Sequence, residues 1–185
     1  MKEHQNLFRD LQEDFRKMKK NLLVAQSGGP TAAINATLAG VIKQAIKEEQ
    51  IDQVYGACYG IQGVLEQKFV NLTEKVDTEE KLEKLKRTPA AALGSCRFKL
   101  NDIKEDDSQY QEIVDILHKM NIGYFVYIGG NDSMDTVGKM SMYVKKHQMD
   151  VKVIGIPKTI DNDLVVTDHT PGFGSAARFL AEAVR

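Results

Sequence analysis

The segment PKTIDND, residues 157–163, places two carboxylates, a hydroxyl and a lysine directly after a short apolar run. Asp161 and Asp163 lie two residues apart, and Lys158 and Thr159 precede them. Such a turn can simply satisfy its own backbone. Phosphoryl transfer gives a more specific interpretation, because an attacking hydroxyl must lose its proton to a base while a fixed cation and a metal neutralise the moving phosphoryl group. Asp161 is then the predicted base, Lys158 the cation and Thr159 a hydrogen-bond donor.

Two Gly-Gly turns elsewhere in the chain have the composition of phosphate-binding loops. SGGPTAAIN contains Gly28 and Gly29, and GGNDS contains Gly129 and Gly130, each before an expected helix. Glycine lets the backbone approach a ligand, and a helix N-terminus offers free amides to an anion. Either turn alone is equally well a tight strand–helix connection, and Asp132 in the second is most simply a helix cap. The two turns together favour a phosphate site.

A third candidate is Arg97, which follows the small residues AAALGS in a tight segment rather than on a helix face. A lone arginine is usually solvated, but a guanidinium can also clamp phosphate oxygens. The stretch GFGSAA at 172–177 matches a dinucleotide-binding pattern, yet no strand precedes it. We therefore interpret that stretch as a loop before the last helix.

The spacing of apolar residues predicts the elements that position these loops. Short apolar runs predict four buried strands, at residues 21–29, 53–60, 124–130 and 151–156. Helical periodicity predicts one helix opened by Pro30, another from a capping box of Asp77 and Glu80 to Arg87, and three more near 113–120, 134–144 and 174–185. No linker interrupts residues 21–185, which we interpret as one domain, and residues 1–20 read as an amphipathic helix.

Near-continuous apolar strands separated by helices predict an α/β fold, with a parallel sheet flanked by helices on both faces in a Rossmann-like arrangement. Ligands bind such sheets beyond the carboxyl ends of the strands. The two glycine turns and the segment 157–163 each follow a predicted strand. We therefore expect the three loops to converge on one edge of the sheet.

Composition narrows the classes of function. Hydrophobic residues make up 42% of the 185 residues, enough for a packed core. The net charge of −1, with both signs interspersed, gives no electrostatic reason to expect a nucleic-acid or membrane surface. The N-terminus is too charged for a signal peptide. Cys58 and Cys96 lack metal-ligand spacing, so we expect small core residues in a cytoplasmic protein.

Four segments, in order and suitably spaced, together resemble the phosphofructokinases: SGGPTAAIN, LGSCRF, GGNDS and PKTIDNDLVVTDHTPGFGSAA. The resemblance runs from residue 21 to the end of the chain. It implies the N-terminal half of a phosphofructokinase-like fold. It also implies transfer of a phosphoryl group to O1 of fructose 6-phosphate, giving fructose 1,6-bisphosphate in glycolysis or gluconeogenesis.

The resemblance also implies roles for individual residues. Asp161 would be the proton acceptor and Asp163 would support it. Contacts with the sugar phosphate would come from Thr159, Ile160, Asp161 and Asp163. The donor would be held by Gly28, Gly29, Arg97, Gly130 and Lys158. The family binds Mg²⁺ through the first acidic residue of GGDDS, which is Asn131 here. An amide oxygen ligates without charge, so ligation should fall on Asn131 and Asp132, with Asp163 or water also contributing.

Two positions bear on the phosphoryl donor. Members that use ATP resemble GGDGS and PGTIDND, whereas this chain has Asp132 and Lys158 where the two glycines fall. A carboxylate at the first position repels a nucleotide phosphate, and an ammonium at the second supplies charge to a short donor. Pyrophosphate is therefore the expected donor, in a reaction that runs in both directions. The alternatives are an ATP-dependent 6-phosphofructokinase and a non-catalytic binding or assembly module.

The chain stops at Arg185, about midway through the catalytic domain of the family. We expect either a fragment of a longer product or a half-domain that does not turn over alone. Apolar surface made for the missing neighbours would seek a partner, so we also expect a homo-oligomer.

Overall fold

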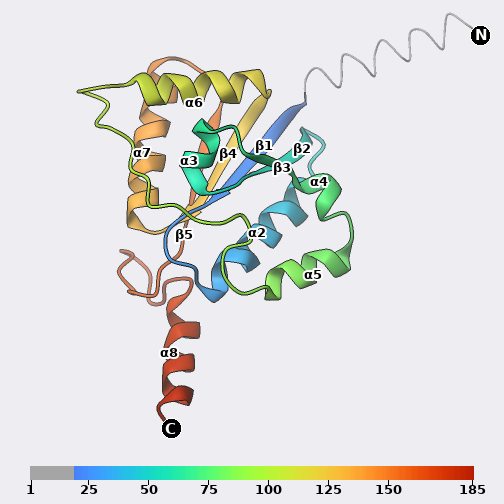
Figure 1. The fold of residues 1–185 in the computed structure, drawn as a ribbon, viewed down its shortest axis with the longest axis vertical. Coiled ribbons are helices and arrows are strands. Elements are labelled where there is room, and N and C mark those ends of the chain that lie inside the picture. The colour runs from blue at the N-terminus through green and yellow to red at the C-terminus, as the bar shows by residue number, and fades with distance from the viewer. Residues whose placement is uncertain (1–18) are drawn as a thin grey trace, which may run out of the picture.

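The computed structural model describes residues 19–185, which form a five-stranded sheet with helices packed around it (Figure 1). The strand order is β3-β2-β1-β4-β5. Four strands run parallel: β1 (Lys20–Gln26), β2 (Ile51–Ala57), β4 (Ile122–Gly129) and β5 (Lys152–Pro157). The fifth strand, β3 (Phe69–Asn71), pairs antiparallel with β2. The predicted α/β fold is confirmed, and β3 corrects the expectation of an all-parallel sheet.

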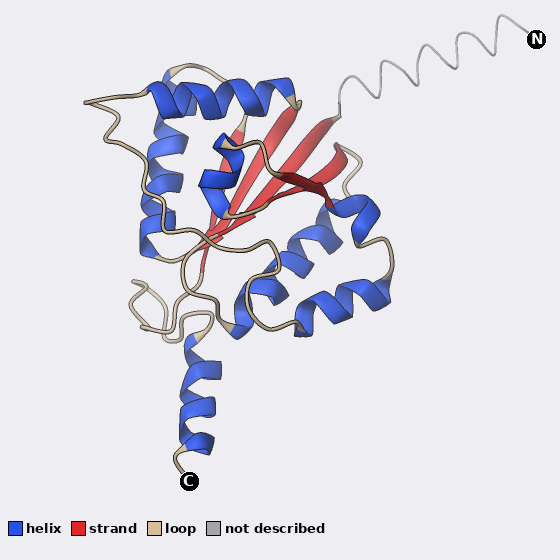
Figure 2. Ribbon diagram, in the orientation of Figure 1, coloured by secondary structure: helices blue, strands red, loops and turns tan. Residues whose placement is uncertain are grey.

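Residues 19–185 contain seven helices; the first six lie on the two sides of this sheet, and the last projects away from it (Figure 2). Their bounds are α2 (Ala32–Ala45), α3 (Gly60–Leu65), α4 (Leu72–Lys75), α5 (Glu79–Arg87), α6 (Ser108–Lys119), α7 (Asn131–Lys146) and α8 (Phe173–Ala183). The helix expected over residues 1–20 lies outside the described residues up to residue 18, and Lys20 already begins β1.

The central strand β1 explains why the apolar runs are continuous. Successive side chains of a strand point to opposite faces. Leu23 and Ala25 join a core with α3, α6 and α7, whereas Leu22 and Val24 join a second core with α2 and α5. Both faces are buried, so β1 needs an apolar residue at nearly every position.

Two helix starts differ by a residue or two from the sequence-based prediction. The helix after the first glycine turn begins at Ala32, because Thr31 is its N-cap and accepts a hydrogen bond from the Ala33 amide at 3.2 Å. The N-cap of α5 is Thr78, whose side chain accepts from the Lys81 amide. The predicted capping box of Asp77 and Glu80 is therefore wrong. Asp77 accepts from Lys81 Nζ at 2.6 Å instead.

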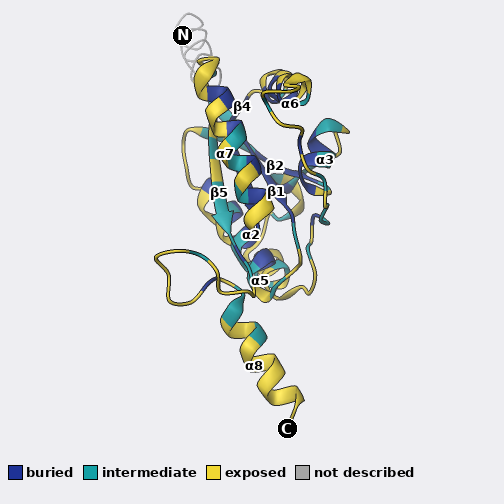
Figure 3. Ribbon diagram, turned by 90° about the vertical axis from the view of Figure 1, so that its left-hand side faces the viewer, coloured by how far each residue is buried: buried dark blue, intermediate teal, exposed yellow. Residues whose placement is uncertain are grey.

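The last helix projects away from the sheet (Figure 3). α8 contains no buried residue, and Phe179 is 70% exposed. Further exposed apolar side chains lie on β5 and in the loop between β5 and α8, namely Ile154, Ile160, Val165 and Val166. This end of the molecule therefore presents apolar surface to solvent. None of the helices within residues 19–185 is long and apolar enough to cross a membrane.

Candidate functional site

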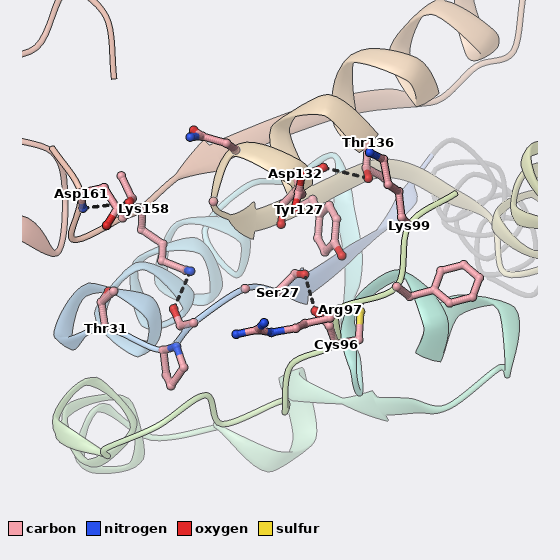
Figure 4. Close-up of a pocket in the computed structure, with 18 of the residues that line it drawn as sticks. Ser27, Thr31, Cys96, Arg97, Lys99, Tyr127, Asp132, Thr136, Lys158 and Asp161 are labelled. Carbon is pink, nitrogen blue, oxygen red and sulfur yellow. Dashed lines mark hydrogen bonds between the residues drawn. The ribbon is translucent and has the colours of Figure 1, made fainter. Parts of the chain in front are cut away.

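The loops after β1, β4 and β5 meet at one edge of the sheet, around a cavity of about 430 Å³ (Figure 4). The loops converge as predicted, because the carboxyl ends of parallel strands lie together. Ten of the residues singled out in the sequence line this cavity: Gly28, Gly29, Arg97, Gly130, Asn131, Asp132, Lys158, Thr159, Ile160 and Asp161.

Lys158 is the only buried charged residue within residues 19–185, with 2% of its surface exposed. Its Nζ donates a hydrogen bond to the Gly29 carbonyl at 2.7 Å, and its backbone amide donates to the Gly129 carbonyl at 2.9 Å. Burial lowers the pKa of Lys158. Lys158 forms no ion pair with the described carboxylates. A buried ammonium without an acidic partner is costly, and an anionic ligand in the cavity would compensate that cost.

The two glycine turns touch each other beside this lysine. A methyl group on Gly28 would lie 3.0 Å from Lys158 Nζ and 3.5 Å from the Gly130 amide nitrogen. Gly28 has a φ of 74°, which side chains rarely adopt. At Gly129 an added Cβ would fall 2.1 Å from Ser133 Oγ. Glycine is therefore required at both turns, and the backbone lies bare where a ligand would approach.

The start of α7 forms the opposite wall of the cavity. Gly130 is the N-cap and provides no capping side chain, so the interpretation of Asp132 as a cap is wrong. Asp132 lies in the first turn, where its negative charge complements the helix dipole. Its backbone carbonyl accepts a hydrogen bond from Thr136 Oγ1 at 3.1 Å. The carboxylate is left on the cavity wall, on the same helix turn as Asn131.

The segment after Lys158 holds Asp161 at the rim. The Asp161 amide donates to Thr159 Oγ1 at 3.0 Å, so the Thr159 hydroxyl keeps its own proton to donate. Asn162 has a φ of 54°, and its Oδ1 accepts from the amide and the hydroxyl of Thr170. These bonds hold the backbone on both sides of Asp161 and so fix the orientation of the Asp161 side chain.

Asp163 does not join the others on the cavity wall. Its carboxylate accepts a hydrogen bond from Asn131 Nδ2 at 2.6 Å. The structure thus places Asp163 against Asn131. Its contact with the sugar and its support of Asp161 stay predictions. Because Asn131 donates the bond to Asp163 through Nδ2, its Oδ1 is not used in it. Oδ1 is the atom of the Asn131 amide that can ligate a cation.

The cavity wall has two side-chain oxygen ligands of the kind found where a metal ion binds together with a phosphate ligand. No group of three acidic, histidine or cysteine side chains that could hold a metal exists within residues 19–185. Mg²⁺, however, is commonly bound by one or two protein oxygens together with substrate phosphates and water. Asn131 Oδ1 and the Asp132 carboxylate provide such a pair on one helix turn. The residues therefore fit Mg²⁺, and their role as ligands stays a prediction.

Of the wall residues that were not predicted from the sequence, three have ionisable side chains. Lys99 is a third cationic residue of the cavity wall, in addition to Lys158 and Arg97, and Figure 4 draws it near Thr136. Its spacing of two residues from Arg97 in a non-helical segment was a usable signal. Tyr127 forms part of the floor, its hydroxyl accepts from the Ile61 amide at 3.2 Å, and burial raises its pKa to about 12. Cys96 also lines the cavity; it is half-buried and packs against one of the two cores, at its edge rather than inside it.

Comparisons with known proteins agree on one family. The family model described as phosphofructokinase matches residues 21–185. The chain is 48% identical over 165 residues to the pyrophosphate–fructose 6-phosphate 1-phosphotransferase of Rhodospirillum rubrum, which covers 89% of this chain and 39% of that protein. Its counterpart in Xanthomonas campestris is 45% identical, over 89% of this chain and 38% of that protein.

A solved structure gives the same result. The pyrophosphate-dependent phosphofructokinase of Nitrosospira multiformis superposes with a TM-score of 0.81 and 39% sequence identity, over 89% of this chain and 40% of that one. The chain thus spans about two fifths of the length of the relatives that it matches.

Proposed function

This chain belongs to the phosphofructokinase family, and from that premise we propose that its cavity binds pyrophosphate for transfer of a phosphoryl group to O1 of fructose 6-phosphate. The observation that carries the proposal is the buried and unpaired ammonium of Lys158 between two bare glycine turns. A compact anion with two phosphates would be the negatively charged partner that this lysine lacks.

Donor binding is assigned to Lys158, Arg97 and the backbone of the two glycine turns. Pyrophosphate concentrates its charge in a small volume, and the cavity offers cations from two segments together with the N-terminus of α7. The ammonium of Lys158 is fixed by its bond to the Gly29 carbonyl. It can therefore stabilise charge on the moving phosphoryl group without first being reoriented.

Asp161 is assigned the role of general base. Its carboxylate lies at the cavity rim, three residues beyond Lys158, and the Thr159 hydroxyl anchors its amide. An acceptor hydroxyl entering from the rim would meet the carboxylate before it reaches the cation. Asp161 would take the proton from O1 of the sugar as O1 bonds to phosphorus, while the second phosphate leaves as orthophosphate.

Asp132 is assigned the selection of the donor. Its carboxylate occupies the cavity wall at the first turn of α7. A nucleoside triphosphate would bring a further phosphate and a nucleoside against the Asp132 carboxylate. Pyrophosphate is smaller and does not need the space that this carboxylate occupies. This arrangement disfavours the ATP-dependent alternative. Mg²⁺, held by Asn131 and Asp132, would offset the charge of the bound pyrophosphate.

Two broader properties belong to the same proposal. The exposed apolar side chains of β5 and α8 support a homo-oligomer, because surface of this kind marks interaction sites. The two free cysteines, Cys58 and Cys96, suit a reducing cytoplasm.

The test uses a hybrid enzyme, in which residues 21–185 replace the matching segment of the Rhodospirillum rubrum transferase. Product formation from fructose 6-phosphate is measured with pyrophosphate and with ATP, and the unmodified transferase is the control. We expect turnover with pyrophosphate and a preference for it over ATP. Faster turnover with ATP would overturn the donor assignment. A folded hybrid inactive with both donors would favour the non-catalytic alternative.

A further inference from the structure

Two fully buried amides lie on either side of the first glycine turn. Gln26 ends β1 and is 0% exposed, and Asn35 lies in α2 and is 1% exposed. Gln26 Nε2 donates to Asn35 Oδ1 at 3.0 Å and to the Ile34 carbonyl at 3.1 Å. The two side chains thus form a hydrogen-bonded pair that connects the residues before the turn with those after it.

The remaining polar atoms of this amide pair bind a distant segment. Asn35 Nδ2 donates to the carbonyls of Thr88 and Ala90, both at 2.8 Å, and its Oδ1 accepts from the Ala92 amide at 2.9 Å. Gln26 Oε1 accepts from the Leu93 amide at 2.9 Å. Four hydrogen bonds therefore attach the segment 88–93 to the glycine turn, and Ala90 adopts a φ of 62° within it.

The same segment continues directly into the cations of the cavity. Ser95 Oγ donates to the Gly28 carbonyl at 2.6 Å, and Ser27 Oγ donates to the Cys96 carbonyl at 3.2 Å. Arg97 follows, exposed and without an ion pair among the described residues. Its position is thus set by its backbone, and that backbone is attached to the glycine turn.

We propose that Gln26 and Asn35 are positioning residues, which fix the segment 88–99 against the first glycine turn and so set the place of Arg97 over the cavity. Apolar side chains would fill the same volume without needing partners. Two amides with every hydrogen-bonding group satisfied instead specify one arrangement of the two segments. The identity of the ligand as pyrophosphate rests on the proposed function, whereas the attachment of the segment does not.

The first test compares Asn35→Ala with Asn21→Ala in the 185-residue protein. Asn21 is a suitable control, because its side chain amide also bonds the backbone of distant residues, Met120 and Gln53, at the opposite end of β1. Hydrogen exchange is followed in peptides that cover residues 88–99. Asn35→Ala should speed exchange there by about 5- to 100-fold, the range expected for lost buried hydrogen bonds, and Asn21→Ala should not. Equal exchange of residues 88–99 in both variants would overturn the proposal.

The second test measures the affinity for inorganic pyrophosphate by titration calorimetry. Asn35→Ala should weaken binding in the wild-type background but add little in an Arg97→Ala background, because it acts through Arg97. Equal weakening in both backgrounds would overturn the positioning role. Should Asn35→Ala not fold, Gln26→Met replaces it, since this variant keeps an unbranched side chain and removes the bond to the Leu93 amide. A wild-type protein that does not bind pyrophosphate would refute the proposed function, and the exchange experiment would still decide the attachment.

Discussion

Replacing Lys158 by methionine removes the buried ammonium and keeps an unbranched chain of similar length. The change tests whether this lysine is retained for a ligand or for the fold. An unpaired charge taken out of water destabilises a protein, so an apolar side chain in its place should leave stability unchanged or higher. The Gly29 carbonyl loses its donor, but Gly29 is exposed and water can replace the bond.

Pyrophosphate affinity should change in the opposite direction. A hydrogen bond between an ammonium and a phosphate oxygen contributes about 1.5–3 kcal/mol. A factor of ten in affinity corresponds to about 1.4 kcal/mol, so Lys158→Met should weaken pyrophosphate binding about 10- to 150-fold. The pH dependence of pyrophosphate affinity gives a second test of the role of Lys158. Burial lowers the pKa of Lys158 below its ordinary 10.5. Affinity should therefore fall as pH rises through that lowered pKa, and binding in this range should take up protons.

Titration calorimetry on the 185-residue protein measures the affinity, and denaturant unfolding measures the stability. Lys152→Met is the control, because Lys152 lies on the same strand β5 but is exposed and outside the cavity wall. It should change neither quantity appreciably. Lys158→Met should also lose the fall of affinity at alkaline pH. The ionisation of pyrophosphate affects both proteins equally, so a difference between their pH profiles reports the titration of Lys158. Unchanged affinity combined with a clear loss of stability would show that Lys158 serves the fold, and would refute the reasoning.

Four further predictions follow from other residues. In the hybrid enzyme Asp161→Asn should lower kcat by about 10²- to 10⁴-fold with little change in KM, because a general base is lost; near-normal kcat in steady-state assays would place the base elsewhere. Asp132→Gly should relax the exclusion of ATP, and an unchanged donor ratio would show that Asp132 does not set it. Because burial raises the pKa of Tyr127 from 10.0 to about 12, stability should be intact below pH 10 and fall by up to roughly 3 kcal/mol as pH rises towards 12; Tyr127→Phe should flatten this fall in denaturant unfolding, and equal slopes would contradict the assignment. The 185-residue protein should self-associate through the exposed apolar side chains of α8, and light scattering that finds a clean monomer would contradict this.

The sequence was sufficient to predict the framework of the site. Apolar runs located β1, β2, β4 and β5, because strands buried on both faces cannot alternate with polar residues. The parallel arrangement then required the loops at their carboxyl ends to meet, and ten of the eleven singled-out residues share one cavity.

Features that depend on distant partners were beyond this reasoning. β3 has three residues, too few for a period of two to be visible, and it exists through its pairing with β2. α3 begins after Tyr59, which has a φ of 66° that no sequence pattern signals for a tyrosine. The backbone partners of Asn35 lie more than 50 residues away in the chain. The contact between Asp163 and Asn131 was not predicted for the same reason, since it arises from the meeting of two loops.

A crystal structure of the 185-residue protein with pyrophosphate and Mg²⁺ tests the central assignment most directly. We expect pyrophosphate between the first glycine turn and the start of α7, with a phosphate oxygen within hydrogen-bonding distance of Lys158 Nζ and the cation next to Asn131 or Asp132. Pyrophosphate bound elsewhere, or a cavity filled while Lys158 Nζ points away from the phosphates, would contradict this assignment.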